Sequence, residues 1–195
     1  MNGLLLLQFP LVHSLLLTGA GQRFLKRLAP ASLGASLSST TYVTVASLQI
    51  LGLFLGWSPS GVIWWQAAGC LRLLWSAFYV LSWLLLLKAM VDSSLALQSG
   101  SLGWWAVFKN RPPCYPKMPV SGMFRWCRQP IYLCFALTTW TVPTWTPDQL
   151  LVSSVLSLYC LIGPLFKEAR YERRYGDDFL NYRKGLPYFL PRPPA

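Results

Sequence analysis

The sequence predicts an all-helical membrane protein, a polytopic bundle of about five transmembrane helices. Two observations indicate this fold class: 54% of the residues are apolar while only 12% are charged, and the mean hydropathy is +0.40. A chain of this composition has too few polar side chains to cover a surface that faces water. Its apolar runs are continuous, whereas the strands of a membrane barrel alternate between apolar and polar residues. Helices also pair every backbone amide internally, as the bilayer requires.

Five apolar stretches approach the roughly 20 residues that a spanning helix needs. They cover residues 1–18, 40–57, 70–91, 131–145 and 150–166. The first stretch does not match a signal peptide, because no basic residue precedes its apolar core and Pro10 and His13 interrupt it. The fourth and fifth stretches are joined by a short link at Pro147 and Asp148. We therefore expect a helical hairpin there, followed by a cytoplasmic C-terminal helix.

Basic residues gather in alternate gaps between these stretches. Lys and Arg cluster after the first, third and fifth stretches, whereas the gaps 57–69 and 145–148 contain none. Because cytoplasmic loops hold the excess of Lys and Arg, we expect the N-terminus outside and the C-terminus in the cytoplasm. The membrane would be the inner membrane of a bacterium, or the endoplasmic reticulum or nuclear envelope of a eukaryote. The same pattern explains the net charge of +11 without a nucleic acid as partner.

The five cysteines do not have the spacing of a metal or disulfide framework. They form no Cys-x-x-Cys pair, and three lie in apolar stretches, so we expect neither a metal ion nor a structural disulfide. Cys127 is the one whose thiolate a neighbouring charge, that of Arg128, would stabilise. Residues 1–195 are expected to form a single integral-membrane domain. The long gap 92–129 is expected to fold over the cytoplasmic mouth of the bundle.

Two motifs flank the predicted hairpin. The first is Arg128-Gln129-Pro130-Ile131-Tyr132, and the second starts at Lys167-Glu168 and continues through Tyr175-Gly176, Tyr182 and Leu186-Pro187. Their order and spacing resemble the C-terminal signature of the integral-membrane methyltransferases, in which Arg-His-Pro-x-Tyr precedes a hairpin and a Glu-Glu pair follows it. That group includes isoprenylcysteine carboxyl methyltransferase, phospholipid methyltransferases and methanethiol S-methyltransferase. The resemblance covers residues 121–191, and His13-Ser14 adds a likeness to the methanethiol enzymes and their nurim-like and NnrU-like relatives.

The chain departs from this signature at two positions. Gln129 stands where the group has His, and Lys167 stands where it has the first Glu. A glutamine side chain still donates and accepts hydrogen bonds. Lys167 reverses a charge, which leaves Glu168 as the carboxylate of the motif.

The resemblance implies that residues 121–191 bind S-adenosylmethionine and that its methyl group is transferred. Glu168 would hold the ammonium of the cofactor, and Arg125 or Arg128 its carboxylate. Aromatic rings attract a cation such as the sulfonium. The residues expected to bind the cofactor are Arg125, Arg128, Gln129, Tyr132, Glu168, Tyr171 and Tyr182. Without the resemblance, the charges would equally fit ion pairs on a solvated helix face, and the tyrosines an interfacial belt.

His13 and Arg174 are the candidate catalytic residues. His13 is the only histidine and lies in an apolar stretch, where ionisable residues are usually functional. It would take the proton of a thiol acceptor as a general base. The alternative is a histidine that is hydrogen-bonded to a neighbouring helix. Arg174 would face the substrate or, alternatively, anchor the chain to lipid headgroups.

The likeness of His13-Ser14 favours a small thiol such as methanethiol as the methyl acceptor. A lipophilic acceptor, either a prenylcysteine carboxylate or a phospholipid amine, stays open, because a bundle in lipid can open sideways. Two other classes also stay open. One is an NADPH-dependent membrane reductase, which would commonly have a longer chain. The other is a non-catalytic membrane scaffold, which the departures at Gln129 and Lys167 keep open.

Overall fold

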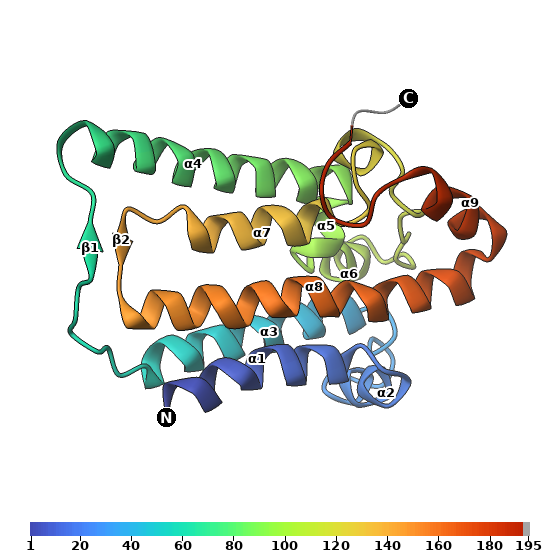
Figure 1. Ribbon diagram of the computed structural model, residues 1–195. Helices are drawn as coiled ribbons and strands as arrows, with labels where there is room; N and C mark the ends of the chain where they lie inside the picture. Colours follow the sequence, from blue (N-terminus) through green and yellow to red (C-terminus); the bar gives the residue numbers. More distant parts are fainter. Residues whose placement is uncertain (193–195) are drawn as a thin grey trace. The chain divides into compact units, whose positions relative to one another are not determined.

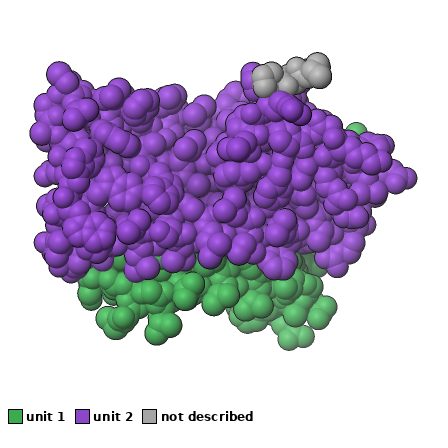
Figure 2. Space-filling view, viewed as in Figure 1, with its two compact units in different colours: residues 1–58, 93–117 green, residues 59–92, 118–195 purple. Residues whose placement is uncertain are grey.

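The computed structural model of the protein describes residues 1–192, which fold almost entirely into helices (Figure 1). The chain forms two compact units, shown in different colours in Figure 2. Unit 1 comprises residues 1–58 and 93–117, and unit 2 comprises residues 59–92 and the chain from residue 118 onward. Each unit is therefore assembled from two separate stretches of the sequence.

Unit 1 consists of five helices. These are α1 (Asn2–Leu16), α2 (Gly19–Arg27), α3 (Ser38–Gly56), α5 (Leu95–Gln98) and α6 (Ser101–Phe108). Helix α3 packs against α1 and α6, and α2 bends away from α1 by 91°. Gly100 allows α6 to approach α3, because it has a positive φ of 75° and a Cβ there would lie 2.9 Å from the Cβ of Val43. The Thr40 hydroxyl fixes this contact by donating to Gly100 O at 2.6 Å and accepting from Trp104 N at 3.1 Å.

Polar side chains pair with one another between α1 and α3. The Gln49 amide donates to Gln8 Oε1 at 2.9 Å, and His13 Nε2 shares a hydrogen bond with the Tyr42 hydroxyl. The His13 and Tyr42 rings are also in contact, with centroids 4.8 Å apart. A polar group in an apolar helix pair needs such a partner, since lipid offers none. The contact of His13 with Tyr42 is the kind expected from the alternative interpretation, in which His13 is hydrogen-bonded to a neighbouring helix.

Unit 2 contains the predicted hairpin. Its elements are β1 (Trp65–Gln66), α4 (Gly69–Asp92), η1 (Gly122–Arg125), α7 (Pro130–Trp140), β2 (Thr144–Trp145), α8 (Pro147–Tyr175) and α9 (Asp177–Gly185). Helix α7 packs against both α4 and α8, and β2 lies at the junction of α7 and α8 (Figure 1). The two short strands pair antiparallel with Trp65 opposite Trp145. Prolines suit the first turns of α7 and α8 because a helix leaves those amides unbonded.

Helices occupy all five predicted apolar stretches, but the fourth and fifth differ in length from the prediction. Helix α7 ends at Trp140 rather than near residue 145, because Pro143 cannot donate to a helix and disfavours a helical conformation at the preceding residue. Helix α8 continues nine residues past the apolar stretch and ends at Gly176, which has a positive φ of 52°. Its charged last turns therefore continue the hairpin helix directly.

The described helices confirm an integral membrane protein that is nearly all-α. Within residues 1–192, α3, α4 and α8 are each long and apolar enough to cross a bilayer, and the bent pair of α1 and α2 adds a fourth span if it is counted as one. Helix α7 is apolar but has only 11 residues. Residues 1–192 thus contain three to four helices of spanning length, and the count of five stays a prediction.

Candidate functional site

The two predicted motifs meet in unit 2 around the carboxylate of Glu168, which is only 7% exposed. Arg128 Nε donates to Glu168 Oε1 at 2.9 Å, and Gln129 Nε2 donates to the same oxygen at 2.6 Å. Arg128 Nη2 approaches Glu168 Oε2 at 3.4 Å. A buried carboxylate is stable only when it is paired and hydrogen-bonded, and these contacts supply both. The carboxylate cluster, defined as Arg128, Gln129 and Glu168, therefore joins the start of α7 to α8.

Arg128 also holds the C-terminal segment against this cluster. Its Nη1 donates to Arg183 O at 3.0 Å and to Leu186 O at 2.7 Å, and its backbone N–H donates to Pro187 O at 3.0 Å. The guanidinium lies over the Tyr188 ring, 5.4 Å from its centroid. One side chain thus connects the hairpin to the end of α9 and the residues after it.

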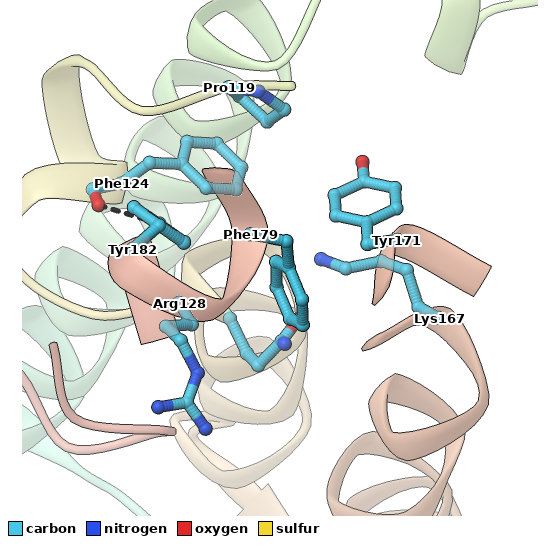
Figure 3. Close-up of a pocket in the computed structure, with 8 residues that line it drawn as sticks. Pro119, Phe124, Arg128, Lys167, Tyr171, Phe179 and Tyr182 are labelled. Carbon is cyan, nitrogen blue, oxygen red and sulfur yellow. Dashed lines mark hydrogen bonds between the residues drawn. The ribbon is translucent and has the colours of Figure 1, made fainter. Parts of the chain in front are cut away.

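A small cavity, half of whose lining residues are aromatic, adjoins the cluster (Figure 3). Its lining residues are Pro119, Phe124, Arg128, Gln129, Lys167, Tyr171, Phe179 and Tyr182. Helix α9 closes one wall, where Phe179 is 1% exposed and the Tyr182 hydroxyl donates to Phe124 O at 2.8 Å. The cavity volume is about 10 Å³, which is about the room that a single water molecule needs.

Asp92, the last residue of α4, positions the wall that carries Phe124. Its Oδ2 accepts from Met123 N at 2.9 Å, and its Oδ1 is ion-paired with Lys88. Gly122 has a positive φ of 60°, and a Cβ there would collide with the Asp92 carboxylate. The glycine therefore permits both the turn into η1 and its close contact with α4.

Gln129 brings an unsatisfied acceptor to the cavity. The residue is 1% exposed, and its Oε1 has no hydrogen-bond partner among the residues that the structure describes. Buried polar atoms in native structures are nearly always hydrogen-bonded. An unsatisfied acceptor in the wall of a cavity is therefore available to a donor on a bound molecule.

Lys167 is the most unusual residue of the site. Its ammonium lies 5.5 Å from the ring centroid of Tyr171, 5.6 Å from that of Tyr132 and 5.9 Å from that of Phe124. Within residues 1–192 no hydrogen bond or ion pair of this ammonium is found. We call Lys167 and these three rings the aromatic cage. The sequence alone showed only that Lys167 reverses a charge, although its spacing of four from Tyr171 places both on one helix face.

The structure brings most of the predicted cofactor-binding residues together. Arg128, Gln129, Tyr171 and Tyr182 line the cavity, and Glu168 and Tyr132 contact residues that do. Sequence reasoning missed Phe124 and Phe179, whose aromatic character was the only signal, and it treated Lys167 only as a departure from the signature.

The remaining candidates have other surroundings. Arg125 is an exposed residue at the end of η1. Arg174 is also exposed, with its guanidinium over the Tyr175 ring at 5.5 Å. His13 lies in unit 1 and is hydrogen-bonded to Tyr42. Their catalytic or binding roles stay predictions.

Burial governs the titration of the nearby thiol and phenol. The pKa of Cys127 is raised, mainly by desolvation, and the residue is 1% exposed. Burial likewise raises the pKa of Tyr182. Arg128 directs its charge at Glu168, so Cys127 does not gain the thiolate character that its sequence neighbour suggested. Among the described residues, no group of three or more His, Cys, Asp or Glu has an arrangement that could hold a metal ion.

Comparison with known proteins gives relatives over nearly the whole chain. A protein of Mycobacterium tuberculosis named methanethiol S-methyltransferase is 29% identical over 199 residues, which cover 98% of this chain and 78% of that protein. A protein of the same name from Crocosphaera subtropica is 24% identical over 184 residues, which cover 94% and 71% of the two chains. The predicted relationship to the integral-membrane methyltransferase group is confirmed.

A third relative is similar to this chain over a shorter region. Nurim of Xenopus laevis is 29% identical over 123 residues, which cover 60% of this chain and 43% of that protein. No family model matches the chain, and no solved structure matches it significantly.

Proposed function

We propose that this protein is a membrane-embedded methyltransferase that moves a methyl group from S-adenosylmethionine to a small thiol, with methanethiol as the first candidate. The similarity to proteins named methanethiol S-methyltransferase, which extends over nearly the whole chain, carries the proposal. The apolar helices support action within a bilayer. The alternation of basic gaps supports an outward N-terminus and a cytoplasmic C-terminus.

The side chains around the cavity have the chemistry that this cofactor needs. S-adenosylmethionine supplies an electrophilic methyl group on a sulfonium, and it also carries an ammonium, a carboxylate and an adenine. Glu168 and Arg128 offer opposite charges, and Gln129 Oε1 offers an acceptor without a partner among the described residues. The rings of Tyr171, Phe179 and Tyr182 offer apolar faces. The kinds of residue therefore fit the cofactor.

The room in the cavity does not fit the cofactor unless the walls move. Pockets for molecules of this size enclose roughly 300–1,000 Å³, whereas this cavity has a volume of about 10 Å³. Two parts of the lining would have to move to enlarge the cavity: the side chain of Lys167, or helix α9, which follows the turn at Gly176. We infer that cofactor binding opens the site by moving one or both. Closing it again would exclude water from the reacting sulfur.

Methyl transfer to a thiol requires that the thiol lose its proton. When bound, the cofactor would supply its methyl group to the thiol sulfur, so that the acceptor would become a thioether and the sulfonium of the cofactor would become a neutral thioether. Catalysis of this kind depends chiefly on positioning and on exclusion of water. We propose that the imidazole of His13 accepts this proton. The Tyr42 hydroxyl orients the His13 ring. The carboxylate cluster would hold the end of α9 and the residues after it in place.

The test is calorimetric binding of S-adenosylmethionine and S-adenosylhomocysteine to the detergent-purified protein, followed by a methyl-transfer assay with a panel of small thiols. Binding with formation of dimethyl sulfide from methanethiol is the expected result. Binding with turnover only of a prenylcysteine or a phospholipid amine would keep the class and replace the acceptor. Absence of binding would refute the proposal. A parallel titration with NADPH would point to a reductase if NADPH bound instead.

A second candidate is a non-catalytic membrane protein with the same scaffold. Two observations favour it: the Lys167 ammonium already occupies the aromatic cage, and Glu168 already has its hydrogen bonds. The binding experiment separates the candidates, because a scaffold of this kind would bind neither form of the cofactor.

A further inference from the structure

The aromatic cage in unit 2 has the composition of a site for an organic cation, yet the protein fills it with its own side chain. Three rings surround the Lys167 ammonium at centroid distances from 5.5 to 5.9 Å. Cations within about 6 Å of an aromatic face are attracted to it, and cages of this kind bind quaternary ammonium groups. A sulfonium is a cation of the same class. The donor of the proposed reaction and Lys167 would therefore compete for one binding place.

The Lys167 ammonium is held by ring contacts alone and by no directional bond among the described residues. The neighbouring charge, Glu168, directs its carboxylate to Arg128 and Gln129, so the ammonium has the rings but no directional bond among the described residues. Its four-carbon stem can carry the ammonium away from the cage. In Figure 3 the Lys167 side chain extends into the space between the ring of Tyr171 and that of Phe179. It therefore occupies part of the space that the cofactor would enter.

We propose that Lys167 is a specificity-determining residue, an internal cation that competes with the sulfonium of the methyl donor for the aromatic cage. This inference rests on the proposed function, since it names the ligand by the cofactor of that reaction. Its consequence is a shift in the preference between two ligands that differ in one charge. S-adenosylmethionine carries the sulfonium, and S-adenosylhomocysteine has a neutral thioether at that position. Lys167 weakens binding of the first and has little effect on the second.

The experiment compares two variants with the parent protein. Lys167→Met keeps an unbranched stem and removes the charge, and the control Lys184→Met removes an exposed charge on α9 of the same unit. Each protein is titrated with both ligands in detergent by calorimetry, and thermal unfolding verifies that each is folded. We expect the ratio of the Kd for S-adenosylmethionine to that for S-adenosylhomocysteine to fall about tenfold in Lys167→Met, because the variant lacks the ammonium that competes with the sulfonium and repels it. The control should keep the ratio of the parent.

The possible failures are distinguishable. If Lys167→Met binds both ligands with the ratio of the parent, the inference is wrong and the proposed function stands. If Lys167→Met loses affinity for both ligands equally, Lys167 binds a group that they share, such as the carboxylate, and the inference is again wrong. If neither ligand binds to any of the folded proteins, the proposed function fails and the inference fails with it. A variant Lys167→Arg, which keeps the charge, should retain the parent ratio, and a fall in its ratio would contradict the charge argument.

Discussion

The two units place different kinds of polar side chain between their helices. Unit 1 pairs the amides of Gln8 and Gln49 with each other, and the His13 ring with the Tyr42 hydroxyl. Unit 2 buries ionic groups, with Arg128 bonded to Glu168 and a lysine held by aromatic rings. Hydrogen bonds between uncharged groups satisfy polar atoms between helices in lipid, and each contributes little to stability. Ionic groups cost far more to bury, and in membrane proteins they generally mark a functional site. The contrast therefore favours unit 2 as the place where the proposed cofactor binds.

The largest effect is expected from breaking the ion pair of unit 2. Arg128→Met leaves the Glu168 carboxylate buried with one amide donor and also removes the bonds to Arg183 O and Leu186 O. Removal of one partner from a buried ion pair destabilises a protein by about 3–5 kcal/mol. Denaturant unfolding in detergent measures the difference. The control is Arg125→Met, an exposed neighbour three residues earlier, which should change stability little. Equal effects of the two variants would refute the special role of the carboxylate cluster.

His13 tests whether unit 1 also takes part in catalysis. His13→Ala should leave cofactor affinity unchanged and lower turnover by about 100-fold, which is the lower range for a general base. Tyr42→Phe removes the hydrogen bond to the ring and should lower turnover less. Steady-state kinetics with methanethiol and calorimetric titration separate the two quantities. Unchanged turnover in His13→Ala would show that His13 is a packing residue. Unit 1 would then have no proposed catalytic residue.

Glu168 probes the binding role of the carboxylate cluster. Glu168→Gln keeps the shape of the side chain but removes the charge that pairs with Arg128. We expect the Kd for S-adenosylmethionine to rise about tenfold or more, in line with the roughly 1.5–3 kcal/mol of a hydrogen bond to a charged group. Calorimetry measures the Kd. An unchanged Kd in a folded Glu168→Gln variant would show that Glu168 does not contribute to cofactor binding. The exposed Glu172, whose partner is Arg183, supplies the control Glu172→Gln.

The sequence was sufficient for the long apolar helices and for part of the candidate site. Continuous apolar runs mark the long helices because a segment buried in lipid must be apolar over its length and must pair its backbone groups internally. Gly176 marks the end of α8 through its backbone freedom. The carboxylate cluster was predictable from two motifs that resemble those of a known group. Its internal bonds were not, since Arg128 and Glu168 are 40 positions apart and nothing local shows that they bond to each other rather than to a ligand. The aromatic cage likewise depends on packing of Phe124 and Tyr132 against α8.

The smallest effect is expected where neutral groups pair. Gln49→Leu removes the bond to Gln8 between α1 and α3 and replaces an amide by an apolar side chain that lipid accepts. Interhelical hydrogen bonds of this kind contribute about 0.6 kcal/mol on average, so unfolding in detergent should shift slightly while cofactor binding stays as in the parent. Ser47→Ala, at an exposed position of the same helix, is the control. A loss as large as that of Arg128→Met would show that neutral pairs also hold unit 1 together, and the distinction between the two units would then rest on the chemistry of their ligands rather than on stability.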